Sequence, residues 1–236
     1  MNIIKFFDEI NALDKGRRRK RIRLAQKMEQ YLLEFFRGIF DDIKYGYFLH
    51  TKSEDIYIHE LCELLIMAYL TFFDEDENEI AITEVSAEDS KLRNHLYQAS
   101  EQIMKTTIDA YLEPEAGTEF DLLRATGQPI AESDIPESII KSLGRERIQL
   151  IAANESLYIN NYMEQKEAIA EGKRFKVWNT MEDERVRPTH QMVDQKEIPI
   201  NEPFTVGVSL MMFPGDTSMN AEASEIIMCR CFLTYK

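Results

Sequence analysis

The sequence predicts an α+β protein that is mostly helical, with an N-terminal helical region followed by a small α+β C-terminal domain of short antiparallel strands. Three observations support this fold class. Only nine glycines and seven prolines occur in 236 residues, which is few for a sandwich with many turns. Apolar residues recur at three- and four-residue steps over most of the chain before Gly172. After Gly172, short segments rich in β-forming residues alternate with turn signals.

Three long helices are expected in the N-terminal region. The first covers residues 22–49, where apolar side chains recur at helical spacing: Leu24, Met28, Tyr31, Leu32, Phe35, Phe36, Ile39 and Ile43. The second begins after Ser53, a possible N-cap, and runs through "IHELCELLIMAYLTFF"; because it is apolar on most sides, it suits the centre of a helical bundle. The third covers residues 85–113 and ends before Pro114, and an acidic connector at 74–79 precedes it.

A change of composition predicts the domain boundary. Residues 113–136 are rich in Pro, Gly and small polar side chains, which indicates a linker between an N-terminal region at 1–136 and a C-terminal domain at 137–236. Pro136 stands where a helix N-terminus accepts it, Gly144 is expected to break the helical pattern, and Gly172 to end it. The segments predicted to form strands are "KRFKVWNT", "EIPI", "FTVGVSLMMF" and "EIIMCRCFLTY".

Composition excludes several classes of protein. With 44% hydrophobic and 30% charged residues, the chain is too apolar for general disorder. No apolar run reaches the length that spans a membrane, and the first 23 residues lack the cleavage-site pattern of a signal peptide. Three cysteines, an odd number, argue against a disulfide framework. We therefore expect the protein to fold in a reducing cytoplasm.

The basic residues are concentrated near the N-terminus, although the net charge is −14. One thirteen-residue window holds Lys15, Arg17, Arg18, Arg19, Lys20, Arg21, Arg23 and Lys27. One interpretation is contact with DNA phosphates or with an acidic partner, for which the candidates are Arg17, Arg18, Arg19, Lys20, Arg21 and Arg23. Such contact would be sequence-independent and would weaken with salt. The other interpretation is a solvated arm that pairs with acidic helices of the same protein.

An ordered set of residues marks the last hundred positions. The single tryptophan stands in "VWNTMEDERVRPTHQMVDQ", followed by "MFPGD" and "MCRC". In chain order the set comprises Trp178, Asp183, Arg185, Arg187, His190, Asp194, Phe204, Pro214, Gly215, Asp216, Cys229, Arg230 and Cys231. Each residue alone has an ordinary structural role, such as a core anchor, an ion pair or a turn. The order of the whole set is more specific, and it can be compared with the motifs of known protein families.

This order resembles the phage head morphogenesis family, the Mu F-like minor head proteins. The family pattern is a Trp, then Asp-x-Arg-x-Arg, two residues, a His, a Pro-Gly-Asp turn and a closing Asn-Cys-Arg-Cys. The preceding segment "RERIQLIAANESLYINNYMEQKEAIAEGKRFKVW" is also similar to the family's helix with its buried "IAxNE". The resemblance covers roughly residues 140–236. Two positions depart from it, because Met228 replaces the usual Asn, which removes a turn hydrogen bond, and Gln195 replaces the common Gly, which argues against a tight turn after Asp194.

The resemblance implies a non-enzymatic minor head protein without a cofactor. It would associate with the phage portal protein, and with scaffold, major capsid protein or DNA as further candidate partners, but not with a membrane. It would act in head morphogenesis or in DNA packaging or ejection. Its expected location is the virion head near the portal vertex, after assembly in the host cytoplasm. On this interpretation the helical region at 1–136 docks on the portal, and the motif residues form a structural network or a contact surface.

Three interpretations of Cys229 and Cys231 are considered. If the segment is a strand, both thiolates face one side and could bind zinc together with His190 and with Asp183 or Asp194. In the second, Cys229 is a nucleophile, His190 its base and Asp183 the orienting carboxylate. The third, which we favour, is a final strand that packs both thiols in the core while Arg230 points the other way and pairs with carboxylates. The alternative function, a zinc-dependent or cysteine-based enzyme or toxin-like effector, depends on the first two.

Overall fold

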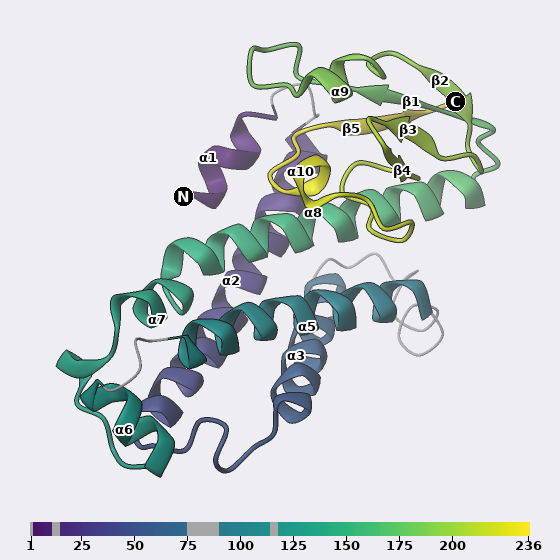
Figure 1. The fold of residues 1–236 in the computed structure, drawn as a ribbon. Coiled ribbons are helices and arrows are strands. Elements are labelled where there is room, and N and C mark those ends of the chain that lie inside the picture. Colours follow the sequence, from purple (N-terminus) through teal and green to yellow (C-terminus); the bar gives the residue numbers. More distant parts are fainter. Residues whose placement is uncertain (1, 11–14, 75–89, 114–117) are drawn as a thin grey trace. The chain divides into compact units, whose positions relative to one another are not determined.

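The computed structural model describes the chain in four segments, which are residues 2–10, 15–74, 90–113 and 118–236 (Figure 1). The chain divides into two compact units, and each is described by itself. The motif unit comprises Met1–Gln26 and Leu150–Lys236. The helical unit comprises Lys27–Gln149.

Each of two long helices has one end in the motif unit and the other end in the helical unit. These helices are α2 (Lys15–Lys44) and α8 (Arg145–Ala170). The compact units therefore divide the chain differently from the boundary expected after residue 136, because the first 26 residues pack with the C-terminal part. The expected helix boundaries are confirmed at three points. Pro136 is the N-cap of a helix, Gly144 separates two helices, and Gly172 follows the end of α8 with a φ of +76°.

The helical unit consists of helices and one 3-10 turn. Besides its parts of α2 and α8 it contains α3 (Glu54–Asp74), α5 (Ser90–Leu112), α6 (Glu119–Thr126), the 3-10 turn η1 (Glu132–Asp134) and α7 (Glu137–Ser142). The α3 helix confirms the helix expected after Ser53, and α5 confirms the later part of the helix expected at 85–113. Residues 75–79 of the expected acidic connector and 85–89 of that helix lie outside the described residues.

Aromatic packing forms part of the core of the helical unit. Phe48 is fully buried, and its ring centroid lies 5.0 Å from that of Tyr57 and 4.8 Å from that of Tyr111. Tyr111 in turn packs edge-on against Phe120 of α6, with centroids 5.9 Å apart. These contacts join α3, α5 and α6, which explains why the apolar α3 sequence is found in a bundle core.

The segment expected to be a linker contains ordered structure. The α6 helix lies inside residues 113–136 and is capped by Thr118, whose hydroxyl accepts a hydrogen bond from the Asp121 N–H. Gly127 ends it in the left-handed conformation with a φ of +64°. A side chain on Gly46 would meet the Gly127 carbonyl oxygen at 2.4 Å, so this close contact requires glycine. Small and polar residues here serve capping and close packing rather than flexibility.

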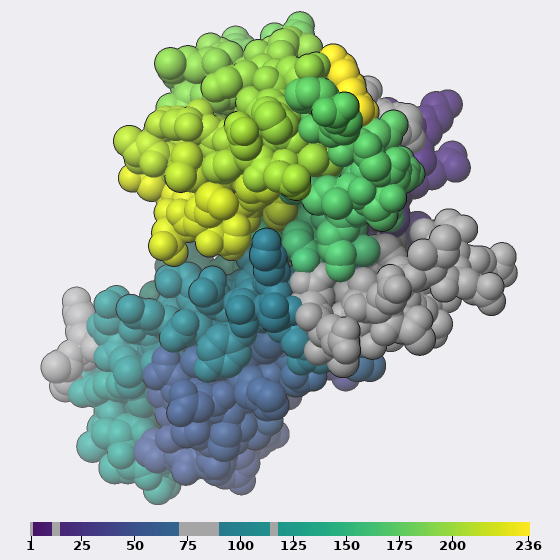
Figure 2. All heavy atoms as spheres, turned by 90° about the vertical axis from the view of Figure 1, so that its right-hand side faces the viewer, coloured from purple at the N-terminus to yellow at the C-terminus, as the bar shows by residue number. Residues whose placement is uncertain are grey.

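The motif unit combines two helix ends with two small sheets. It also contains α1 (Ile3–Asp8), β1 (Phe175–Asn179), α9 (Pro188–Gln191), β2 (Glu197–Pro199), β3 (Phe204–Val206), β4 (Ser209–Met211), α10 (Ala223–Ile226) and β5 (Phe232–Tyr235). The α1 helix was not expected from the sequence; Asn2 caps it and Phe6 and Phe7 are buried. In Figure 2 the purple atoms of the N-terminal residues lie against the green atoms of the C-terminal part, as expected for one unit.

The strands confirm the expected antiparallel arrangement. One sheet has the order β2-β1-β5, and β3 and β4 form a separate hairpin. In the central strand β1, Val177 pairs with Glu197 on one side and with Thr234 on the other. Figure 1 shows the motif-unit end of α8 running along these strands, and polar side chains of α8 bond to their connecting loops. The sheet is thereby fixed to the helix that precedes it in the sequence.

A buried ion network explains why the start of α2 belongs to the motif unit. Arg21 is fully buried, and its Nη2 donates to Asn161 Oδ1 at 2.6 Å and to Glu164 Oε2 at 3.2 Å. Arg17 Nε donates to Glu164 Oε1 at 3.0 Å, and its Nη2 donates to the Leu233 carbonyl at 3.2 Å. Burial lowers the pKa of Arg21, while Glu164 acts in the opposite direction. The network joins α2, α8 and β5.

Among the residues that the structure describes, no helix is long and apolar enough to cross a lipid bilayer.

Candidate functional site

Three residues of the ordered motif pack together, and Trp178 of the central strand β1 lies between the other two. Its side chain is fully buried, and its ring packs edge-on against Phe204 of β3 with centroids 5.2 Å apart. On the other side it packs edge-on against the imidazole of His190, 5.6 Å away. Trp178 therefore joins β1, the β3-β4 hairpin and the short helix α9.

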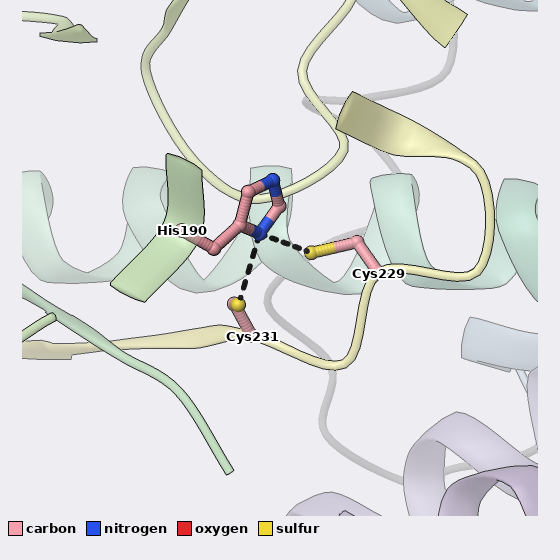
Figure 3. Close-up of side chains that lie close together, drawn as sticks. All are labelled: His190, Cys229 and Cys231. Atoms are coloured by element: carbon pink, nitrogen blue, oxygen red, sulfur yellow. Dashed lines mark hydrogen bonds between the residues drawn. The ribbon is translucent and has the colours of Figure 1, made fainter. Parts of the chain in front are cut away.

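His190 lies on α9 and has a polar partner at each ring nitrogen. Its Nδ1 lies 3.3 Å from the Cys231 sulfur and 3.6 Å from the Cys229 sulfur (Figure 3). Its Nε2 lies 3.0 Å from Glu225 Oε2, which also accepts a hydrogen bond from the Thr189 hydroxyl at 2.8 Å. Because the carboxylate can only accept, Nε2 carries a proton and Nδ1 faces the two thiols.

Cys229 and Cys231 lie in the loop between α10 and β5. The strand expected at 225–235 is limited to Phe232–Tyr235, so the thiols are not placed by strand alternation as expected. Instead the turn after α10 directs both sulfurs toward His190 (Figure 3). Both cysteines are free and almost fully buried. Packing of the thiols in the core, the favoured interpretation, agrees with this placement.

The cluster formed by His190, Cys229 and Cys231 shares protons unequally. A hydrogen bond with Cys231 and the neighbouring imidazole lower the pKa of Cys229 well below that of a free thiol, against the effect of burial. The pKa of Cys231 is raised by that same hydrogen bond and by burial. Burial lowers the pKa of His190, but the hydrogen bond and the charge of Cys229, together with the charge of Glu225, outweigh burial, so the net shift is upward. The cluster therefore favours one thiolate next to an imidazolium.

The charged residues of the motif form a separate network. Arg230 donates two hydrogen bonds to the Asp183 carboxylate, at 2.7 and 2.6 Å, and this pairing lowers the pKa of Asp183 to about 2. Arg185 Nη1 donates to Glu9 at 2.9 Å, and Arg187 donates to the Ile227 carbonyl. Arg230 thus points away from the thiols, as expected.

Asp183 is not where two of the hypotheses required it. Zinc binding and thiol catalysis both used its carboxylate beside His190, but it is held by Arg230, and Glu225 occupies that position instead. The other candidate fourth ligand, Asp194, accepts the Thr180 N–H at 2.7 Å. Glu225 could not be identified from the sequence, because it lies on α10, far in sequence from His190 and four residues before Cys229.

The Pro-Gly-Asp turn is more than a surface turn. The Pro214 carbonyl accepts a hydrogen bond from the Asn161 side chain of α8 at 2.6 Å. Asp216 is buried and accepts the N–H groups of Met212 at 2.8 Å and Ser218 at 2.9 Å. Gly215 has a φ of +88°, which favours glycine. The turn is therefore fixed to α8 from inside.

Both departures from the family pattern occur at left-handed backbone positions. Met228, where Asn is usual, has a φ of +55°, and Gln195, where Gly is common, has a φ of +57°. Asn and Gly are the residues that adopt this conformation at least cost. The turn after Asp194 forms nevertheless and is closed by the Lys196 N–H, which donates to the Val193 carbonyl at 3.1 Å. The Met228 N–H donates to a distant side chain, Asn154 Oδ1 of the "IAANE" segment, at 2.8 Å.

A comparison with known protein families identifies the family of this chain. The model of the family described as Phage Mu protein F like protein matches residues 115–234, which is half of the chain. The chain belongs to the Phage Mu protein F like family. This membership places it among phage head morphogenesis proteins and implies association with the virion. No curated protein and no solved structure matches the chain significantly.

The basic run of this Mu F-like chain is partly internal. Arg17 and Arg21 bind Glu164, so they stabilise the motif unit. Arg18 lies 4.0 Å from Asp8 of α1, and Lys20 is partly buried. The exposed members are Lys15, Arg19 and Arg23, which are four residues apart on α2 and so share one face.

The Mu F-like motif has limited room for chemistry. A thiolate beside an imidazolium is a nucleophile in many enzymes, but Cys229 is only 1% exposed. His190 and Cys231 line a pocket of about 20 Å³ together with Met181, Arg185, Val186, Arg187, Met228 and Arg230. Such a volume accommodates about one water molecule and no substrate side chain. The arrangement suits the binding of a small species rather than turnover.

Proposed function

We propose that this chain is a non-enzymatic minor head protein that associates with the phage portal and acts in head morphogenesis or in DNA packaging or ejection. The observation that carries the proposal is the family match over residues 115–234. The hydrogen bonds of the motif residues inside the motif unit also support the proposal. Asp183, Arg230 and Asp216 bond to other groups of that unit, and these bonds stabilise its fold.

Burial of the reactive groups supports a non-enzymatic role. His190, Cys229 and Cys231 are exposed by 1%, 1% and 3%, so a substrate has no direct access to the thiols. An enzyme needs its nucleophile within reach of a bound substrate. The motif therefore acts as an internal support of a folded module, as a head assembly component requires.

The helical unit is our candidate for portal docking. Near the end of α2 it exposes two aromatic side chains, Tyr45 at 57% and Tyr47 at 52%, whose ring centroids lie 6.1 Å apart. Tyrosines are enriched in protein interfaces because they bury a large area with little loss of side-chain entropy. The motif unit also exposes apolar side chains, of which Met192 at 84% and Val208 at 82% are the most accessible.

The test is co-expression of the full chain with the portal protein of the same phage. The complex is purified through a tag on the portal, and its mass is determined at low and high salt. We expect a stable complex of defined stoichiometry. A chain that remains monomeric beside an assembled portal would overturn the proposal.

Paired variants test which unit docks. Tyr45→Asp with Tyr47→Asp should weaken portal binding, whereas Met192→Asp with Val208→Asp in the motif unit is the matched control and should not. Circular dichroism checks that both variants are folded. The reverse result would transfer the docking role to the motif unit.

Binding of DNA is a second part of the proposal and rests on the exposed basic face of α2. Arg19→Glu with Arg23→Glu should reduce retention of the chain on duplex DNA, and the wild-type retention should fall steeply with salt. The control is Lys166→Glu on α8, which changes the same type of charge elsewhere. Retention that is unaffected by Arg19→Glu with Arg23→Glu would remove DNA from the set of partners.

A further inference from the structure

We propose that His190, Cys229 and Cys231 form a binding site for a thiophilic divalent cation, most specifically Zn²⁺. The bound ion would link α9 to the loop before β5. The imidazole Nδ1 and both thiolate sulfurs are its ligands. These three atoms lie within 4.8 Å of one another, and all three residues are buried. The site would stabilise the motif unit and is distinct from portal docking.

The spacing of the three ligand atoms fits tetrahedral coordination. In a tetrahedral site with Zn–S near 2.3 Å and Zn–N near 2.0–2.1 Å, a sulfur and a nitrogen ligand are separated by about 3.5 Å. Here Nδ1 of His190 lies 3.3 Å from the Cys231 sulfur and 3.6 Å from the Cys229 sulfur. An ion can therefore enter between the three atoms with very small side-chain movements.

The surroundings of His190 are those of a metal ligand. A metal-bound histidine usually donates its other ring N–H to a carboxylate, which fixes the tautomer and makes the ligating nitrogen more basic. Glu225 accepts from Nε2 at 3.0 Å and is held by the Thr189 hydroxyl at 2.8 Å. This support holds Nδ1 facing the two sulfurs, where a metal ion would replace its proton (Figure 3).

Charge balance also favours a divalent ion. Two thiolates carry two negative charges, which a divalent cation cancels. The buried cluster therefore stays neutral when the ion binds, and two protons leave to solvent, one from the remaining thiol and one from Nδ1 of the imidazolium. The buried Nε1–H of Trp178 interacts with the Cys231 sulfur. A donor directed at a thiolate is a common support of metal-bound sulfur.

The pocket beside the cluster provides the fourth ligand. It is lined by His190 and Cys231, and its volume of about 20 Å³ accommodates one water molecule. Three protein ligands and one water complete a tetrahedral set. The small volume limits the ion to a structural role, because no larger group reaches the fourth position.

The first test measures metal in the full chain. The protein is produced in zinc-supplemented medium, freed of any tag, and analysed by elemental mass spectrometry after removal of loose metal. We expect about one zinc per chain in the wild type, and a reduction of at least about tenfold in Cys229→Ser, Cys231→Ser and His190→Gln. Cys62→Ser, which removes the buried thiol of the helical unit, is the matched control and should retain the metal.

The second test does not depend on variants that could fail to fold. Wild-type chain is stripped with a chelator and titrated with Co²⁺, whose thiolate charge-transfer and tetrahedral ligand-field bands report sulfur ligation. Zn²⁺ should displace Co²⁺ and raise the melting temperature, whereas Mg²⁺ should not.

Three results would overturn the inference. They are a wild-type chain that holds less than about a tenth of an equivalent of zinc after incubation with excess, Co²⁺ binding without thiolate bands, and a Cys62→Ser variant that loses as much metal as Cys229→Ser. The portal experiment is independent, because a chain without zinc can still dock on the portal through its helical unit.

Discussion

The two units bury polar side chains in different ways. In the helical unit the buried polar side chains among the described residues are Glu29, His95, Ser100 and Thr107. Ser100 and Thr107 donate to backbone carbonyls one turn earlier in their own helix, Leu96 and Ile103. The motif unit buries a larger polar set, namely Arg21, Ser156, Asn160, Asn161, Gln165, Lys176, Thr180, His190, Ser209, Asp216 and Glu225.

Most of these motif-unit groups bond between elements that are far apart in sequence. Asn161 reaches the Pro214 carbonyl, Gln165 the Ile200 carbonyl at 3.2 Å, and Lys176 the Met212 carbonyl at 2.7 Å. The helical unit is thus specified mainly by apolar periodicity, and the motif unit by a polar network with fixed partners. Because an unpaired buried polar group is costly, such a network tolerates few changes, and this accounts for a recognisable ordered motif.

The largest effect is expected where a buried charge loses its partner. Glu164→Gln leaves the fully buried Arg21 without a full counter-charge and should destabilise the motif unit by about 3–5 kcal/mol. Urea unfolding followed by fluorescence of Trp178, the single tryptophan, reports this unit. In the helical unit, Glu29→Gln should cost about 1 kcal/mol or less, because the side chain of its partner Arg145 is 70% exposed. Equal losses of stability in Glu164→Gln and Glu29→Gln would show that the two units do not differ in how strongly they depend on buried charges.

An apolar truncation should affect the helical unit selectively. Leu61→Ala removes a fully buried side chain of α3 and should cost about 3 kcal/mol. Since the helical unit contains most of α2, α3 and α5, far-UV circular dichroism should show its earlier unfolding, with the Trp178 fluorescence transition little changed. A shift of the fluorescence transition by the same amount would mean that the units unfold as one.

A pH-dependent effect is expected for Lys176 in the motif unit. Burial lowers its pKa to about 8 from 10.5, although Asp216 acts in the opposite direction. Between these two pH values the unfolded chain binds a proton that the folded chain does not, so the Lys176 contribution to stability rises with pH. Lys176→Met removes this titration, so the stability of the variant relative to the wild type should fall by about 1–2 kcal/mol between pH 8 and pH 10.5. Parallel stability curves for wild type and variant between pH 7 and 10.5 would contradict the assignment.

The smallest effects are expected at the two left-handed positions. Met228→Asn and Gln195→Gly restore residues suited to a positive φ and should each stabilise the motif unit by about 0.5–1 kcal/mol. Ile227→Asn, which lies beside Met228 at a φ of −60°, is the control and should not stabilise. Destabilisation by both Met228→Asn and Gln195→Gly would show that the Met and Gln side chains contribute more than backbone strain costs.

The same contrast decides what the sequence could predict. Helical spacing of apolar residues was sufficient for α3 and for most of α5 and α8, and Pro136, Gly144 and Gly172 marked helix ends correctly. The basic residues before position 22 concealed the start of α2, because their partner Glu164 lies on a distant helix. The polar composition of 113–136 concealed α6 in the same way.

For the site, the order of the motif residues identified the side chains that form it, but not all of their hydrogen-bond partners. The pairing of Arg230 with a carboxylate and the packing of both thiols were predicted correctly. Glu225 as the partner of His190, and the roles of Asn154 and Asn161, require the fold, because each contact joins segments that only tertiary packing brings together. The thiols were predicted on a strand, yet a turn at Met228 directs them to His190.

The central claim is that the Mu F-like motif supports the fold of the motif unit. The most direct test is urea unfolding of the Cys229→Ala, Cys231→Ala double variant, followed by Trp178 fluorescence, with Cys62→Ala as the control for loss of a buried thiol. The account predicts a clear loss of stability of the motif unit in the double variant, with the helical signal largely kept. A double variant as stable as the wild type would contradict it and would return attention to the thiols as reactive groups.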